Sequence, residues 1–550
     1  MENNTNDEAR DASSTTRISA TTLSSRLIHH CRFLLAEIDI FQNAIASRFR
    51  RHQQQQHLVE MRLLRSNVAS ELRTLERLAA DTQALVNERA KKGDNDDDAD
   101  LEMREGRIIH TLRSSNLSFL TAVWTIAKER CSGVVAFSKR FYWDKDENKV
   151  VDGKEDRQAK PPNKDKKKSA FVDIVYGNGE DWLKVSTVNQ SRLLFEMAEK
   201  GWEMDSDEEE DEASSTRNDQ GKELPINQDE EDEDQLELIT MALDMIRASR
   251  ATRVRYRNPR VHIMAPKLEE GKVPEIDRVL NTIRSYGVTI ECKIQIRDIF
   301  TEDKIYETCD PNSITENDLP LSTMLPNPFE KFTHVINVDC TLLLALVSDL
   351  SHVQNIEPSP NFHRAIIRQI EVEDELPLLT TELWPAVVGR QLVCTQEAAK
   401  RMKEIVYTIG TETERKRTAI LLGEGDMEGL DKDTLLGELR KLSDHSVPEK
   451  LILPMKVVDA HAEIGAAMKQ NKFPPVISKV TEILTDINYS VFLYGWASDI
   501  VTISSNKTVV RQIEATIEDN RGYDNTLEGP KIWICDTARS LIGKEKHRKP

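Results

Sequence analysis

The sequence predicts an α/β protein whose C-terminal part holds a parallel sheet, preceded by a mainly helical α+β region. Three observations predict this class. An apolar strand candidate, 332–338, ends at Asp339 and passes at once into the apolar helix candidate 342–347. Residues 260–290 follow the order strand, helix, strand, which builds parallel sheets. Residues 23–91 instead repeat leucine at three- and four-residue steps, which is typical of amphipathic helices.

Length and charge divide the chain into parts. At 550 residues it is too long for one hydrophobic core. Residues 203–234 carry sixteen acidic and two basic residues, a net −14 of the total −19, so the folded parts are nearly neutral. The predicted organisation is a disordered tail 1–20, an N-terminal domain 21–203 with a disordered insert 144–168, an acidic disordered linker 204–235, a strand–helix–strand segment 236–330 that packs with the C-terminal domain, and that domain itself, 331–550.

The cysteines and the apolar runs indicate the cellular compartment in which the protein is expected. Seven cysteines are scattered singly without a CxxC pair, which suits a reducing compartment. The first residues are polar and acidic, unlike a secretory signal. No apolar run approaches the roughly 20 residues that cross a bilayer. We expect a cytoplasmic or nuclear protein with no membrane partner.

The local patterns predict further elements. Residues 171–185 form a hairpin around the turn 177–179, and a helix follows near 189–200. In the C-terminal part, we expect a long irregular loop over 351–385. The remaining predicted elements there are a helix over 396–408, a helix from Thr413, and short strands around 490–505.

The acidic stretch 94–105 has two interpretations. Asp94, Asp96, Asp98 and Glu105 occupy the first, third, fifth and twelfth positions of a calcium loop. Ala99 stands where the sharp turn of that loop needs glycine. We therefore prefer a disordered acidic loop.

Two basic segments also leave alternatives open. The lysines at 164–168 suit a localisation signal, a nucleic-acid contact or, more commonly, a solvated linker. Arg253, Arg255 and Arg257 alternate and would share one face of an extended segment. Such a row could grip the phosphates of a nucleic acid or neutralise the neighbouring acidic linker.

Asp339 is the first candidate for a functional residue. A buried carboxylate is costly unless a partner or a metal compensates it, and open α/β sheets bind ligands at the carboxyl ends of their strands. Glu397 and Glu404 lie seven apart and share one helix face. Glu412 and Glu414 open the next helix, whose positive end favours carboxylates in any case.

Asp499, which follows residues 494–498 and precedes Val501, completes the set of acids. Carboxylates that converge at strand ends would hold Mg²⁺ or Mn²⁺, which prefer oxygen ligands. Two such ions would generate a hydroxide and stabilise the leaving oxygen of a phosphodiester. A charged surface supplies similar acids by chance, so the sequence alone leaves convergence open.

Several segments resemble an uncharacterised eukaryotic family, domain-of-unknown-function family thirteen-oh-eight, whose C-terminal part is similar to PIN domains. The signature-like segment is 337–351, with Asp339 near its start. Residues 408–417, 494–506 and 256–259 are similar to further parts of the family. The resemblance covers most of the chain outside the linkers and implies a PIN-like three-layer C-terminal domain.

PIN domains are typically metal-dependent ribonucleases, so the resemblance implies roles for individual residues. It implies catalytic roles for Asp339, Glu414 and Asp499, the last only with a shift of the motif. The implied metal ligands are Asp339, Glu397, Glu404, Glu414, Asp499 and Asn506. The implied nucleic-acid contacts are Arg253, Arg255, Arg257, Arg415 and Arg417.

Two functions follow as hypotheses. The first is a Mg²⁺- or Mn²⁺-dependent endoribonuclease that cuts single-stranded RNA. The alternative is a catalytically inactive PIN-like scaffold or adaptor that binds RNA or protein, with protein partners docking on the acidic linker and the N-terminal helices.

Overall fold

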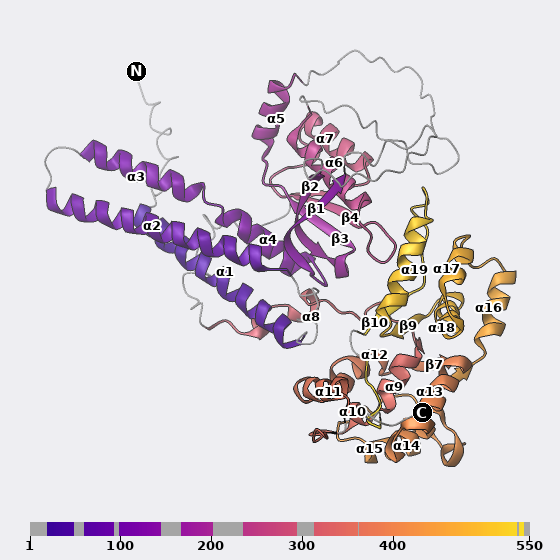
Figure 1. The fold of residues 1–550 in the computed structure, drawn as a ribbon. Coiled ribbons are helices and arrows are strands. Elements are labelled where there is room, and N and C mark those ends of the chain that lie inside the picture. The colour runs from indigo at the N-terminus through magenta and orange to yellow at the C-terminus, as the bar shows by residue number, and fades with distance from the viewer. Residues whose placement is uncertain are drawn as a thin grey trace, which may run out of the picture. The chain divides into compact units, whose positions relative to one another are not determined.

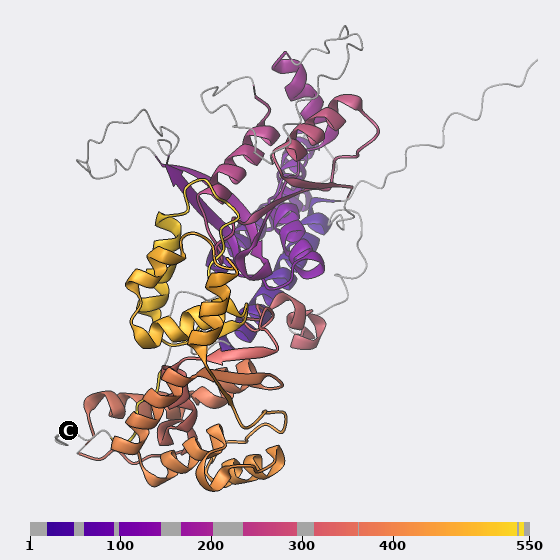
Figure 2. The ribbon, with the colours of Figure 1, turned by 90° about the vertical axis from the view of Figure 1, so that its right-hand side faces the viewer.

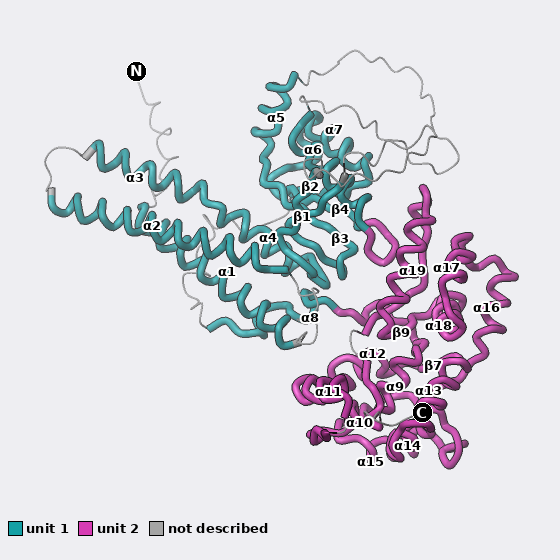
Figure 3. Tube along the Cα trace, in the orientation of Figure 1, with its two compact units in different colours: residues 1–49, 57–252, 259–326 teal, residues 50–56, 253–258, 327–550 magenta. Residues whose placement is uncertain are grey.

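The structure is a computed structural model that describes residues 19–48, 60–92, 98–144, 167–201, 235–293, 313–360, 362–535 and 538–543. The predicted tail 1–20, insert 144–168 and acidic linker 204–235 lie almost wholly outside the described residues. The chain forms two compact units (Figure 3). Unit 1 comprises residues 1–49, 57–252 and 259–326, and unit 2 comprises residues 50–56, 253–258 and 327–550.

Four helices open unit 1, and α2 and α3 form a long antiparallel hairpin (Figure 1). The helices predicted from the leucine pattern are confirmed. The predicted helices are α1 (Ala20–Arg48) and α2 (Arg62–Lys92). They are followed by α3 (Asp98–Arg113) and α4 (Leu117–Arg130), which lie beyond the leucine pattern. The preferred interpretation of 94–105 as a disordered loop was wrong for its second part, because Asp98 to Glu105 form the start of α3. Glu105 lies 3.6 Å from Arg89 of α2 and accepts a hydrogen bond from the backbone of Ala20.

A five-stranded sheet in the order β1-β2-β3-β4-β5 forms the centre of unit 1. The predicted hairpin 171–185 is confirmed, because β2 and β3 pair antiparallel on either side of the turn at Gly177–Gly179. The strands are β1 (Ala136–Asp144), β2 (Lys167–Tyr176), β3 (Asp181–Val185), β4 (Arg260–Ala265) and β5 (Thr289–Cys292). Helices α1, α2 and α4 cover one face of the sheet. The other face is covered by α5 (Gln190–Glu199), α6 (Glu237–Arg250) and α7 (Pro274–Ser285).

The predicted strand–helix–strand order of 260–290 is confirmed, and its two strands join the sheet of unit 1. β4 pairs in parallel with β3, and β5 pairs in parallel with β4. Residues 259–326 therefore belong to unit 1, and the packing of 236–330 with the C-terminal domain stays a prediction. The apolar pattern of this segment shows that its strands are buried. It does not show which of the two sheets the strands join.

Unit 2 contains the predicted parallel sheet, in the order β10-β9-β6-β7-β8. Every strand pair in this sheet is parallel. The strands are β6 (Val335–Val338), β7 (Gln391–Thr395), β8 (Lys456–Val458), β9 (Val501–Ser504) and β10 (Ile532–Ile534).

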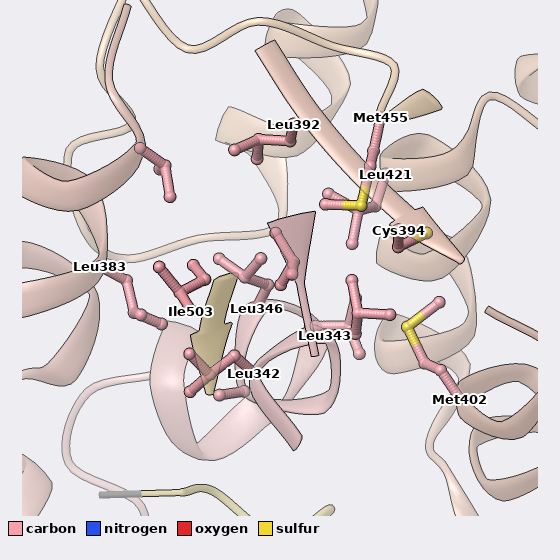
Figure 4. Packing of buried hydrophobic residues seen from close by; sticks show 14 of the residues in the cluster. Leu342, Leu343, Leu346, Leu383, Leu392, Cys394, Met402, Leu421, Met455 and Ile503 are labelled. Carbon is pink, nitrogen blue, oxygen red and sulfur yellow. The ribbon is translucent and has the colours of Figure 1, made fainter. Parts of the chain in front are cut away.

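Helices cover both faces of this sheet, which gives three layers; Figures 1 and 2 show the unit from two sides. One face packs on α9 (Cys340–Val347), α12 (Trp384–Val387), α13 (Gln396–Ile409), α14 (Glu412–Leu422) and α15 (Lys432–Lys441). The other face packs on α16 (Ala460–Lys469), α17 (Ile477–Ile483), α18 (Asp486–Ala497) and α19 (Lys507–Asp519). Figure 4 shows Leu342, Leu343 and Leu346 of α9 packed among Ile503, Leu392 and Met402.

Two local predictions in unit 2 were wrong. Residues 351–385 are largely helical: they include the end of α10 (Asp349–His352), α11 (Arg364–Glu375), a π-helical turn (Leu379–Leu383) and the start of α12. Of the segment 490–505, the first part is helix α18 and only Val501–Ser504 is a strand. The remaining short helix, α8 (Leu321–Met324), belongs to unit 1. Within the described part of the chain, none of the helices has the length and apolar character needed to cross a membrane.

Candidate functional site

The order of the strands in unit 2 identifies one place where a ligand site is expected. β6 is the central strand, and the chain adds β7 and then β8 on one side of it. It then returns to place β9 and β10 on the other side. The direction of winding therefore reverses between β6 and β9. In open α/β sheets, the crevice at such a switch point, at the carboxyl ends of the strands, is where ligands bind.

Asp339 lies at this switch point, directly after β6 and at the start of α9. Its side chain is buried, and its Oδ2 accepts hydrogen bonds from Ser504 Oγ at 2.6 Å and Thr341 Oγ1 at 2.7 Å. Its backbone N–H donates to Ile503 O at 3.0 Å, which fixes the residue against β9. Burial raises the pKa of Asp339 more than these hydrogen bonds lower it.

Polar groups from the neighbouring strands lie at the same end of the sheet. We call this end, where the carboxyl ends of the parallel strands lie, the carboxyl edge. Thr395, at the end of β7, caps α13, and its Oγ1 lies 3.1 Å from Oγ of Ser490, near the start of α18. Asn506 follows β9 and caps α19 by accepting a hydrogen bond from Val509 N. The N–H of Ser505 donates to Thr341 Oγ1 at 3.3 Å. The edge is thus lined by hydroxyl and amide groups around one carboxylate.

Glu397 shares this edge, whereas Glu404 does not. Glu397 is in the first turn of α13, and its Oε1 lies 3.4 Å from Nε2 of His461 in the first turn of α16. Its Oε2 is buried and has no hydrogen-bond partner among the residues that the structure describes. Glu404 is seven residues farther along α13, about 10 Å from Glu397 along the axis. It is exposed and lies 3.3 Å from Arg401.

Glu414 lies at the other end of α9 from Asp339. It is fully buried and closes a capping box with Thr411 at the start of α14. Its carboxylate also accepts hydrogen bonds from the backbone N–H groups of Asp349 at 3.0 Å and Ile542 at 3.2 Å. Asp349 follows the C-terminal end of α9, and eight helical residues span about 12 Å. The structure therefore does not bring Asp339 and Glu414 together around one ion.

The burial of Glu414 has an electrostatic consequence. Burial raises its pKa, although three backbone hydrogen bonds act in the opposite direction. Every described contact of this carboxylate ties a chain segment to the start of α14. The capping interpretation that the sequence left open accounts for the contact with Thr411, and the other two contacts join Asp349 and Ile542 to α14.

Asp499 lies at the opposite ends of the strands, where the strands begin. It precedes β9, with a positive φ of 53°, whereas Asp339 follows β6. Because the two strands are parallel, these residues are separated by the length of a four-residue strand, about 13 Å. The Asp499 side chain is 80% exposed and lies 2.7 Å from Lys531.

Taken as a set, the six predicted metal ligands are dispersed. Asp339, Glu397 and Asn506 follow neighbouring strands, and the other three lie elsewhere. Over the described residues, no group of three or more His, Cys, Asp or Glu side chains is placed to hold a metal ion. These side chains do not fit a multi-carboxylate metal centre.

The predicted nucleic-acid arginines in 253–258 contact other parts of unit 2. Arg253 donates to Asn525 at 2.8 Å and lies 3.6 Å from Glu518, and Arg257 pairs with Glu528. Arg255 has a positive φ of 50° in the turn of this short hairpin. Neither alternative from the sequence anticipated that two of these side chains would join the hairpin to the segment after α19.

The two predicted arginines of α14 differ in exposure. Arg417 is buried, so its guanidinium is not accessible to RNA in this structure. Arg415 is exposed and donates to Tyr407 O at 3.1 Å.

Sequence reasoning missed several residues of the carboxyl edge. Thr341, Ser490 and Ser504 supply hydroxyls there, and His461 follows a strand too short to recognise from its pattern. The signal that was present is a hydroxyl residue placed at the end of an apolar strand, as in Ser504 after Val501–Ile503.

Comparison with known proteins gives one match, in the first half of the segment 327–550 of this unit. Residues 336–438 match the family described as "Protein of unknown function (DUF1308)". The match runs from β6 into α15 and includes Asp339, Glu397 and Glu414. The resemblance to this family is confirmed over that segment. No curated protein and no solved structure matched the chain.

Proposed function

We propose that unit 2 is a PIN-like binding module that holds single-stranded RNA along the carboxyl edge of its sheet, beside Asp339, without a multi-carboxylate metal centre. The observation that carries this proposal is the dispersion of the predicted acids. Only Asp339 and Glu397 follow neighbouring strands, whereas Glu414 caps α14 and Asp499 lies at the opposite edge.

The chemistry of the edge supports an anionic, hydroxyl-rich ligand. Helices α9, α13, α16 and α19 all begin there, directly after strands β6, β7, β8 and β9. The N-terminal end of a helix is positive and presents backbone N–H groups, which favours phosphate. Serine, threonine and asparagine side chains commonly contact the phosphates and sugars of nucleic acids. The hydroxyls of Thr341 and Ser504 and the amide of Asn506 are groups of this kind.

A Mg²⁺- or Mn²⁺-dependent ribonuclease is the second candidate. The observation that favours it is Glu397 Oε2, which is buried and has no partner in the described part of the chain. Proteins often hold Mg²⁺ with one or two carboxylates and complete its shell with substrate phosphates. Asp339 and Glu397 would be those carboxylates, and the ion would supply Lewis-acid stabilisation of the phosphodiester.

The two candidates are separated by measuring binding and cleavage on the same samples. A 5′-fluorescent RNA of about twelve nucleotides, long enough for one binding site, is titrated with the full chain and then incubated with Mn²⁺. We expect saturable binding without cleavage. Ser504→Ala, which removes one of the hydroxyls proposed to contact the RNA, should weaken binding, and Asp499→Asn, at the opposite ends of the strands, should leave it unchanged.

The other outcomes decide against the proposal in distinct ways. Mn²⁺-dependent cutting that Asp339→Asn abolishes would establish the ribonuclease. Absence of RNA binding by the folded full chain would reject both candidates in favour of a protein-binding scaffold.

A further inference from the structure

Three helices of unit 2 bring one side chain each from their first turns to the same part of the carboxyl edge. Glu397 comes from α13, His461 from α16 and Tyr489 from α18. The rings of His461 and Tyr489 are stacked, with centroids 5.8 Å apart and planes 21° from parallel. His461 Nε2 lies 3.4 Å from Glu397 Oε1. The imidazole is therefore held between an aromatic ring and a carboxylate.

The outer part of the His461 ring is open to solvent. Its side chain is 60% exposed although Tyr489 covers one of its faces. Tyr489 is itself partly buried against the hydrophobic cluster between the sheet and α16–α19. The partly buried ring of Tyr489 thus supports the exposed ring of His461, and this is the arrangement of a stacking platform.

Glu397 adds an unused hydrogen-bond acceptor beside this platform. Its Oε2 has no hydrogen-bond partner among the described residues, yet the side chain as a whole is 26% exposed. An unpaired carboxylate oxygen is energetically unfavourable away from water. A small rotation of the carboxylate would present it to a donor on a ligand stacked over His461.

We propose that His461 is a stacking platform for one base of a bound RNA strand, and that Glu397 accepts a hydrogen bond from the exocyclic amino group of that base. The inference rests on the proposed function, because it places a base of the RNA held beside Asp339. Stacking on an aromatic ring serves every base. A glutamate acceptor selects amino groups, such as cytosine N4, and offers nothing to the O4 carbonyl of uracil.

The test compares three RNA oligomers of about eight nucleotides, made of cytidine, adenosine or uridine only. Binding to the full chain is measured by fluorescence anisotropy at one fixed salt concentration. We expect the cytidine and adenosine oligomers to bind more tightly than the uridine oligomer. His461→Ala should weaken all three about tenfold, and His461→Phe should restore the affinity because it keeps an aromatic ring.

Glu397→Gln separates the two parts of the proposal. It should reduce the preference for cytidine over uridine about fivefold while leaving stacking intact. Matched controls lie on the same helix: Glu404→Gln and Tyr407→Ala replace exposed residues near the far end of α13 and should change nothing.

Each contrary result identifies the claim that fails. If wild-type protein binds RNA and His461→Ala binds equally well, the platform is wrong and the proposed function stands. If wild-type protein binds the three oligomers equally, the role of Glu397 is wrong. If wild-type protein binds none of them, the proposed function fails and this inference fails with it.

Discussion

Arg417 and Asp349 form an ion pair inside unit 2, with Nη1 and Oδ1 2.6 Å apart and side chains 1% and 10% exposed. The same guanidinium donates to the backbone oxygens of Leu442, at 2.6 and 2.9 Å, and Val347, at 3.1 Å. One side chain therefore links α14 to the end of α9 and to the segment after α15. Arg417, which the resemblance suggested for RNA binding, thus makes several contacts that stabilise the fold of unit 2.

We predict that Arg417→Ala lowers the free energy of unfolding by about 3–5 kcal/mol, because it leaves the Asp349 carboxylate buried and without its cation. Urea unfolding of the full chain measures the change. Arg415→Ala, two residues earlier on the exposed face of α14, should stay within about 0.5 kcal/mol of wild type. Equal losses in the two variants would contradict the role given to Arg417.

Asp339→Asn should change how stability depends on pH. The raised pKa means that folded Asp339 keeps its proton above pH 3.8, near which an unperturbed aspartate loses it. The folded state then binds more protons than the unfolded state, so stability falls as pH rises from this value through the folded pKa. The asparagine variant lacks this fall, and its slope should differ by up to about 1.4 kcal/mol per pH unit.

The measurement is urea unfolding at several values between about pH 4 and pH 7. At the upper end, Asp339→Asn should be at least as stable as wild type, because one amide oxygen can still accept the hydrogen bonds of Ser504 and Thr341. Asp499→Asn is the control, since its side chain is exposed. Parallel curves for wild type and Asp339→Asn would reject the argument.

Two glycine substitutions should have opposite effects on stability. A Cβ added at Gly529 would lie 2.5 Å from Tyr256 Cζ and 2.6 Å from Ile517 Cδ1, so Gly529→Ala should cost about 1–3 kcal/mol. Gly437 lies within α15 with nothing within 4 Å of its Cβ position. Gly437→Ala should therefore stabilise by up to about 1 kcal/mol. Thermal melting of both variants beside wild type tests the contrast, and a loss in Gly437→Ala as large as in Gly529→Ala would contradict it.

Arg539 and Glu373 should show strong coupling in a double-mutant cycle. Their ion pair is buried, with side chains 2% and 5% exposed, and Arg539 Nε donates to Glu373 Oε2 at 2.6 Å. We expect Arg539→Met to cost about 3–5 kcal/mol and the double variant with Glu373→Met to recover much of this loss. Urea unfolding of the four proteins gives the coupling energy. Additive losses would show that the pair acts as two independent residues.

The parts of the fold that follow from local pattern were predictable. The apolar run before Asp339, the glycine-containing turn at 177–179 and the leucine steps of α1 and α2 each carry their own periodicity. The assignment of 260–290 to a sheet was not predictable in this way. Strand pairing joins residues distant in sequence, such as Leu183 and His262, and no local pattern encodes it.

The candidate site was predictable only where the chain order fixes the geometry. Asp339 and Asn506 lie at one edge because each follows a parallel strand. The capping box of Glu414 was predictable from its spacing of three residues from Thr411. Asp499 precedes its strand, so the rule that locates Asp339 would have excluded it once the strand boundaries were known.

The six-residue hairpin 253–258 constrains how this protein can be divided experimentally or shortened by evolution. It belongs to unit 2 but is encoded between two segments of unit 1. A fragment beginning at residue 327 would lack Tyr256, whose ring lies next to Gly529. The hydrophobic cluster around Ile517, against which Tyr256 packs, would then be uncovered at this point. Unit 2 is therefore not encoded by one continuous stretch of sequence, and a gene fusion that moved residues 327–550 alone would leave the position of the missing hairpin empty.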